Sequence, residues 1–217
     1  LFFFLVFGLP PGFSQCVSSA ASDGFKRQLL VGVGGQGTIL ASKILTAGLI
    51  AAGYDVKMSE VHGMSQRGGS VSTQVRYGTK VYSPIIGWGQ ADILVAFETM
   101  EAIRYLPDLK PGGKVVVNDY QMPSLPILSG EREYPDNILE ELQSKADTLV
   151  LDAAAIAQAN GNPKSMNVVL LGALIQSLGL QDLDWDTALR SCVKSKFVEV
   201  NLRCLDAGMR TAEGDRG

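Results

Sequence analysis

Apolar and polar positions alternate along the chain in blocks that predict strands and helices in turn. Leu29–Val33 is a short aliphatic run that ends in glycines, which indicates a buried first strand. Between Thr38 and Ala52 apolar residues recur at helical spacing, and Gly53 is placed to end that helix. The same signals predict strands over Tyr54–Val61, Ser70–Tyr77, Ala91–Phe97, Lys114–Asn118 and Thr148–Leu151. They predict further helices over Thr99–Leu106, Ile138–Ala146, Ala153–Ala159, Val168–Leu178 and Trp185–Ala207, the last of them broken near Phe197.

Strands that alternate with helices favour an α/β fold with a mostly parallel sheet and helices on both faces. We therefore expect a Rossmann-like single domain, and the length of 217 residues suits one continuous core. The expected boundaries are an N-terminal extension over residues 1–24, the folded domain over 25–207 and a polar tail over 208–217.

The N-terminal extension begins with the apolar run LFFFLVFGL, followed by two prolines and small polar residues. The run is too short to span a bilayer as a helix, so we expect no membrane association. Its order resembles the end of a signal peptide, but neither a methionine nor a basic leader precedes it. We favour a translated upstream stretch or a mispredicted start over a signal-like remnant.

Composition narrows the functional classes. The net charge of -3 gives no concentrated basic face, so nucleic acid is not an expected partner. The three cysteines, Cys16, Cys192 and Cys204, have no CxxC spacing and cannot hold an iron–sulfur cluster alone. They also form no disulfide framework, which fits a cytoplasmic protein. We expect no metal site on this chain.

Candidate chemistry starts between the first strand and the first helix, in the segment GVGGQGT. Glycines there allow a sharp turn and a close approach of phosphate, and the following helix offers free N–H groups and its positive dipole end. We therefore predict that the segment binds a cofactor through Gly32, Gly34, Gly35, Gln36, Gly37 and Thr38. The alternative is a tight strand–helix turn that binds no ligand.

A second candidate is the loop EVHGMSQRGGSV, which starts at Glu60. Glu60 lies 23 residues (60 − 37) after Gly37, about where a ribose-binding acid stands in an NAD site. The loop concentrates hydrogen-bond donors on flexible backbone, which is typical of a surface that contacts an anion or a cofactor. We assign Arg67 to the cofactor site, and the following to a loop that contacts substrate or partner: Glu60, His62, Ser65, Gln66, Gly68 and Gly69. The alternatives are a half-buried His62 that orients a turn and a plain surface charge at Arg67.

Together these motifs, with ADILVAFE, EAIRYL and NVVLLGAL, resemble the gamma-type domain of the 2-oxoacid:ferredoxin oxidoreductase family. The resemblance covers roughly Lys26 to Leu205, and the His-Gly-Met-Ser-Gln-Arg loop is similar to the branch that acts on indolepyruvate. It implies an oxidative decarboxylation of the 2-oxoacid to its acyl-coenzyme A with reduction of ferredoxin.

The resemblance also implies a partner, because the chain lacks the GDG…N motif that binds thiamine diphosphate and magnesium. A larger subunit is implied to carry thiamine diphosphate, Mg and the iron–sulfur clusters and to reduce ferredoxin, so this chain is expected to be inactive alone and to carry no catalytic residue. Our hypothesis is that the glycine segment and Arg67 face the phosphates of coenzyme A in a shared site. Trp88, between two glycines, is a candidate anchor for the partner, or else an ordinary turn tryptophan.

Three other functions stay open. One keeps the family and changes the substrate to pyruvate, a branched-chain oxoacid or 2-oxoglutarate. Another is a free-standing NAD-dependent dehydrogenase. The third is a structural scaffold subunit.

Overall fold

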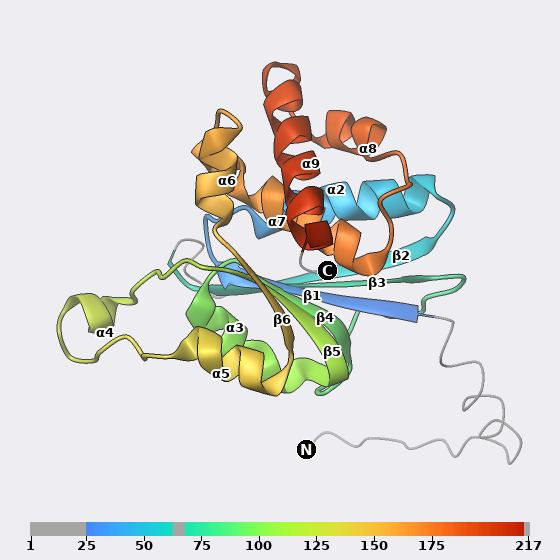
Figure 1. Cartoon of the computed structure of the whole chain (residues 1–217). Helices are drawn as coiled ribbons and strands as arrows, with labels where there is room; N and C mark the ends of the chain where they lie inside the picture. The colour runs from blue at the N-terminus through green and yellow to red at the C-terminus, as the bar shows by residue number, and fades with distance from the viewer. Residues whose placement is uncertain (1–24, 63–67, 215–217) are drawn as a thin grey trace, which may run out of the picture.

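The computed structural model describes residues 25–62 and 68–214 of the chain. They form three layers, with one six-stranded sheet between two layers of helices (Figure 1). The strands lie in the order β2-β3-β1-β4-β5-β6. Their bounds are β1 Phe25–Val33, β2 Asp55–His62, β3 Ser70–Gly78, β4 Ala91–Ala96, β5 Leu109–Asn118 and β6 Asp147–Leu151.

Strand directions confirm a mostly parallel sheet. The neighbouring pairs β1–β4, β4–β5 and β5–β6 are parallel. Strand β3 is antiparallel to both of its neighbours, β1 and β2, and lies between them. The prediction of a single α/β domain is therefore confirmed, with one reversed strand inserted at the place where a simple βαβ unit would put β2 beside β1.

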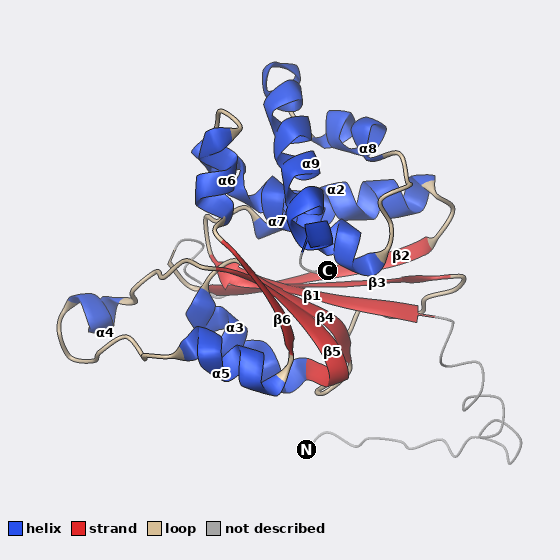
Figure 2. Cartoon of the chain, viewed as in Figure 1, coloured by secondary structure: helices blue, strands red, loops and turns tan. Residues whose placement is uncertain are grey.

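Helices cover both faces of the sheet (Figure 2). One layer, called here the upper layer as in Figure 1, contains α2 Thr38–Ala51, α6 Ala153–Ala159, α7 Met166–Leu178, α8 Trp185–Cys192 and α9 Val198–Gly214. The lower layer contains α3 Thr99–Tyr105 and α5 Ile138–Lys145. The short helix α4, Leu125–Leu128, stands on an arm that projects from the sheet edge.

The two faces of the sheet bury different side chains. On β1, Leu30 packs into the cluster beneath the upper helices, whereas Leu29 and Val31 pack into the cluster with the lower helices. This alternation follows from the two-residue period of a strand. Because both faces of the sheet are covered, the inner parts of β1 and β4, Leu29–Val31 and Ile93–Ala96, are continuous apolar runs in the sequence.

The C-terminal part confirms one expectation and corrects another. The helix break near Phe197 is confirmed, since α8 ends at Cys192 and α9 begins at Val198 after a short 3-10 turn. The polar tail was placed wrongly, because α9 continues to Gly214 and buries Gly208 and Ala212. A Cβ on Gly208 would lie 2.0 Å from the carbonyl oxygen of Val169, so α9 packs on α7 with backbone against backbone. Earlier in the chain, strand β5 starts at Leu109 rather than at the expected Lys114, and a register shift carries it through Pro111, Gly112 and Gly113.

Candidate functional site

The glycine segment forms the turn between β1 and α2. Gly35 and Gly37 have φ values of +106° and +89°, a region that side-chain-bearing residues rarely adopt. Gly37 is the N-cap of α2, and no side chain caps this helix. The first N–H groups of the helix lack intrahelical partners, so they are available to an acceptor outside the helix. The local geometry therefore suits an anion.

Gln36 has a structural role, unlike the other members of the segment. Its Oε1 accepts a hydrogen bond of 2.7 Å from the backbone N–H of Val33, and its Nε2 donates one of 3.1 Å to the carbonyl of Phe97. The side chain thus joins the ends of β1 and β4. A Cβ on Gly32 would lie 2.8 Å from Gln36 Oε1, so glycine at position 32 makes room for this bridge. Gln36 and Gly32 do not line the cavity beside the turn, and the expectation that Gln36 faces a cofactor is not supported.

A cavity of about 320 Å³ opens in front of the turn. His62, at the end of β2, lines it opposite the start of α2. The complete lining is Gly34, Gly35, Gly37, Thr38, Ile39, His62 and Val71. The structure therefore brings together the two motifs that the sequence placed 25 residues apart (62 − 37).

The second loop returns to the glycine turn through its backbone. Gly34 N–H donates to the carbonyl of Gly69 at 2.9 Å, and Gly68 N–H donates to the carbonyl of Gly34 at 3.4 Å. Gly68 and Gly69 thus hold the two loops together. The predicted site residues Ser65, Gln66 and Arg67 lie outside the described residues, so their assignments stay predictions.

Glu60 does not occupy the position that an NAD site requires. In such a site the acid follows the strand next to β1, whereas here β3 separates β2 from β1. Glu60 pairs with Thr73 of β3 and does not line the cavity beside the glycine turn. The ribose-binding interpretation of Glu60 is therefore not supported.

A second cavity, of about 350 Å³, lies on the other face of the sheet at the same edge. Gly68 and Ser70 line it from one side, and Met100, Glu101 and Met122 are among the residues that line it from the other. Helix α2 follows β1 on the upper face of the sheet, and α3 follows β4 on the lower face (Figure 1). Both cavities therefore lie beside the point where successive connections leave the sheet on opposite faces. Ligands of open α/β sheets bind in this position.

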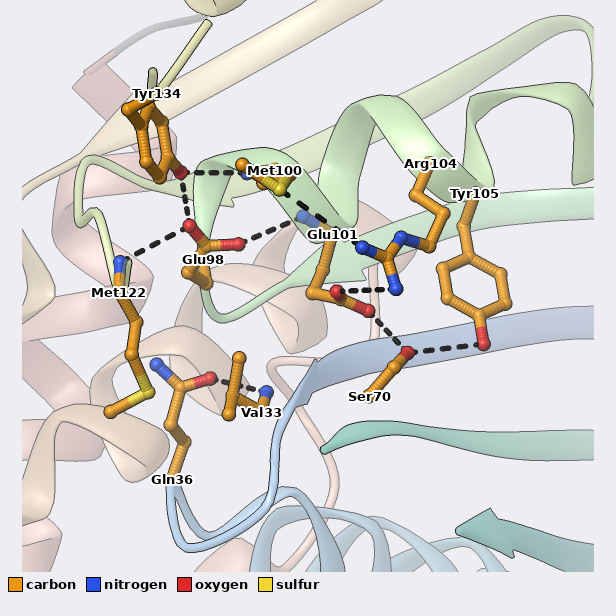
Figure 3. Close-up of polar contacts among 10 residues, drawn as sticks. All are labelled: Val33, Gln36, Ser70, Glu98, Met100, Glu101, Arg104, Tyr105, Met122 and Tyr134. Atoms are coloured by element: carbon orange, nitrogen blue, oxygen red, sulfur yellow. Dashed lines mark hydrogen bonds and ion pairs between the residues drawn. The ribbon is translucent and has the colours of Figure 1, made fainter. Parts of the chain in front are cut away.

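Glu98 organises the wall of the second cavity. It is 1% exposed and caps α3 by accepting a hydrogen bond of 2.9 Å from Glu101 N–H. It also accepts from Met122 N–H at 3.2 Å and from the Tyr134 hydroxyl (Figure 3). Burial, and then the Glu98 carboxylate, raise the pKa of Tyr134, so the phenol stays protonated and acts as a donor. One carboxylate therefore fixes both ends of the α4 arm, at Met122 and Tyr134.

Glu101 is the second acid of this wall. Burial raises the pKa of its carboxyl group, while the Ser70 hydroxyl and the Arg104 guanidinium oppose that rise. Arg104 Nη1 lies 3.3 Å from Glu101 Oε1, and Tyr105 Oη lies 3.4 Å from Ser70 Oγ (Figure 3). Sequence reasoning missed Glu98, Glu101 and Tyr134. The signal for the first two was available, because acids directly after a buried parallel strand lie at the edge where ligands bind.

Comparison with known proteins decides the family. Residues 27–211 match the family model described as pyruvate ferredoxin/flavodoxin oxidoreductase. The chain belongs to this family. The resemblance of its motifs to 2-oxoacid:ferredoxin oxidoreductases is thereby confirmed.

Individual members of the oxidoreductase family differ in how closely they match. Indolepyruvate oxidoreductase subunit IorB of Pyrococcus horikoshii is 39% identical over 85% of this chain and 95% of its own length. The pyruvate/ketoisovalerate oxidoreductases common subunit gamma of Thermococcus kodakarensis is 26% identical over 76% of this chain and 83% of its own length. In structure, 2-oxoglutarate:ferredoxin oxidoreductase from Magnetococcus marinus, solved with 2-oxoglutarate, coenzyme A and succinyl-CoA bound, matches with a TM-score of 0.69. That match has 20% identity and covers 88% of this chain and 32% of the other.

Metal ligands and thiols are relevant to this chain, because its family consists of oxidoreductases. Within residues 25–62 and 68–214, no group of three or more His, Cys, Asp or Glu side chains is placed to hold a metal ion. Cys192 and Cys204 are free thiols, and burial raises the pKa of Cys204. Over the same described ranges, every helix is too short or too polar to cross a membrane.

Proposed function

We propose that this chain is the small subunit of an indolepyruvate oxidoreductase. The enzyme converts indolepyruvate and other aryl pyruvates to the acyl-coenzyme A and carbon dioxide, and ferredoxin accepts the electrons. The observation that carries the proposal is the 39% identity to the IorB subunit over 85% of this chain and 95% of that subunit. Pyruvate, branched-chain oxoacids and 2-oxoglutarate are the alternative substrates, and the 26% identity to the pyruvate/ketoisovalerate gamma subunit gives them less support.

The chain acts with a larger subunit and is inactive alone. That subunit carries the thiamine diphosphate, the magnesium and the iron–sulfur clusters, and it passes electrons to ferredoxin. Two features of this chain support the division. Its sequence lacks the thiamine motif, and its three cysteines are too few for a cluster. The free thiols Cys192 and Cys204 are consistent with a cytoplasmic enzyme.

The contribution of this chain to the shared site is to hold coenzyme A by its phosphates. The thiol of bound coenzyme A takes the acyl group. The backbone N–H groups at the start of α2 fit the phosphates, because no side chain caps this helix and Gly35 leaves open space in front of it. Gly34, Gly37 and Thr38 line the same cavity. His62 faces this cavity from β2, where it orients the ligand, and Arg67 supplies positive charge.

Reconstitution tests the proposed function. The purified chain is mixed with its larger subunit, and reduction of ferredoxin or a viologen dye is followed with indolepyruvate and coenzyme A. We expect activity only when both chains are present, and higher kcat/KM for indolepyruvate than for pyruvate or 2-oxoglutarate. Equal activity of the larger subunit without this chain would contradict the subunit assignment. A preference for pyruvate would keep the subunit and change the substrate.

A further inference from the structure

The segment between β3 and β4, residues 79–90, carries three large apolar side chains that point into solvent. Tyr82 is 86% exposed, Trp88 82% and Ile85 57%. Several large exposed apolar groups on one short segment mark interaction sites more often than single exposed ones do. Of the two alternatives for Trp88, its exposure favours a residue presented to a partner over a turn tryptophan packed on its own domain.

Buried side chains and hydrogen bonds hold the backbone of this segment in one conformation. The three apolar side chains are exposed in that conformation. Val81 and Ile86 are buried anchors on either side of the tip. The backbone N–H of Val81 donates to Asp55 at 2.8 Å, and that of Ile86 donates to Gln74 at 2.6 Å. A segment with fixed backbone presents its aromatic side chains at a small entropic cost on binding.

The anchors also show where the segment lies. Val75 and Tyr77 of β3 pack into the upper core, so Gln74 and Arg76 point to the lower face. Segment 79–90 bonds to both of them and therefore lies beneath β3. Helices α3 and α5 lie beneath β1, β4, β5 and β6 (Figure 1). In the described part of the chain, β2 and this half of β3 have segment 79–90 on their lower face instead of a helix.

Basic side chains surround the apolar group. Lys57, Arg76 and Arg27 are direct neighbours in register across β2, β3 and β1, so all three share the lower face. The two arginines donate to the backbone of the segment, Arg76 to Ile85 O at 3.0 Å and Arg27 to Gln90 O at 3.4 Å. Burial, and then the charge of Arg27, lower the pKa of Arg76. Lys80 adds another cation, 5.8 Å from the centroid of the Tyr82 ring.

We propose that this surface, defined by Tyr82, Ile85 and Trp88 with the bordering cations Arg76 and Lys80, is where the larger subunit docks. Lys57 is not counted among these cations, because it is paired with the carboxylate of Asp55. The larger subunit meets it with an apolar patch bordered by carboxylates. The inference rests on the proposed function, because that function requires a permanent partner. A second copy of this chain is the poorer occupant, since a two-fold contact through this surface brings its own cations face to face.

The experiment compares matched exposed residues in binding to the purified larger subunit. Ile85→Ser and Trp88→Ser remove apolar contacts from the surface, and each is expected to raise the Kd about tenfold or more. Ile50→Ser is the control, because Ile50 on α2 is 56% exposed and Ile85 is 57% exposed. We expect its Kd to stay within about twofold of wild type. Lys80→Gln is expected to weaken the dependence of the Kd on salt.

Each outcome separates the surface from the proposed function. Wild-type chain that fails to bind the larger subunit would contradict the proposed function itself. Wild-type chain that binds, with Ile85→Ser and Trp88→Ser binding as tightly, would overturn the docking surface alone. Sedimentation of the chain by itself tests whether the surface binds a second copy. If Trp88→Ser dissociates a homodimer while its affinity for the larger subunit is unchanged, the surface binds a second copy. The proposal would then be wrong.

Discussion

Single residues of the glycine segment have separable roles, although they stand side by side in the sequence. Gly32 makes room for a side chain, Gln36 joins two strands, and Gly37 caps a helix in a left-handed conformation. Gly35 differs from all three, because a Cβ there would meet no atom of the chain within 4 Å. Apart from the positive φ that it permits, its missing side chain therefore matters to a ligand that enters the cavity.

Gly35→Ala tests that role. The variant is expected to lose about 1–2 kcal/mol of stability from its positive φ and to raise the KM for coenzyme A about tenfold by obstructing the N–H groups of the turn. Gly53→Ala is a matched control, since Gly53 has a φ of +88° and also open space around it. Thermal unfolding of both variants and coenzyme A kinetics in the assembled enzyme provide the measurement. An unchanged KM in Gly35→Ala would remove the turn from the coenzyme A site.

Glu101 gives the chain a stability that depends on pH. Because burial raises the pKa of its carboxyl in the folded state, its contribution is most favourable below the ordinary value of 4.5. That contribution is lost as the pH rises through the raised folded-state pKa. We expect Glu101→Gln to gain stability relative to wild type between acid and neutral pH, as measured by urea unfolding at a series of pH values. A stability difference that stays constant with pH, or moves the other way, would show that Ser70 and Arg104 outweigh burial.

At the scale of elements, the pair α7–α9 depends on close backbone approach. A Cβ on Gly172 would lie 2.1 Å from the carbonyl oxygen of Leu205, just as Gly208 faces Val169. These contacts explain why the end of α9 is difficult to recognise in the sequence. Its composition is polar and small, because the helix is packed through glycine backbone rather than through large apolar side chains.

Gly208→Ala is expected to destabilise the fold by about 3 kcal/mol, because the added methyl group forces the two helices apart. Gly214→Ala, at the end of the same helix, has no atom of the chain within 4 Å of the added Cβ and is the control. Denaturant unfolding of both variants provides the comparison. Equal stability of the two variants would mean that α7 and α9 can separate at little free-energy cost.

For the whole molecule, the sequence predicted the layers but not the order of the strands. Alternating apolar runs and helical periods define β1, α2 and β4, and glycines with a following helix define the turn that we propose to bind an anion. A strand pattern carries no direction, so the reversed β3 between β1 and β2 could not be read from SVSTQVRYG. The position of Glu98 after β4 could be recognised in the sequence, but its role in holding the arm could not, because two of its donors, Met122 and Tyr134, come from a later connection of the chain.

The strand order has a direct functional consequence. With β3 in place, Glu60 is one strand too far from the turn to bind a ribose there. We therefore expect NADH to give no saturable binding signal when its fluorescence is titrated with this chain. Coenzyme A binding to the assembled enzyme is the positive control. Saturable NADH binding that Gly35→Ala abolishes would restore the dehydrogenase interpretation.

Because the Glu98 carboxylate holds both ends of the α4 arm, the residues between those ends can vary without moving the sheet. Glu98 receives Met122 from one end and Tyr134 from the other, so the chain between them forms a closed excursion from the sheet. The entropy of closing such an excursion grows slowly with its length. Beyond Pro123, Ser124 and Leu128, which line the second cavity, we expect that the arm can be shortened, extended or exchanged for another sequence while the strands and the glycine turn keep their positions. The arm is thus a natural place to graft a tag or a new binding segment onto this fold.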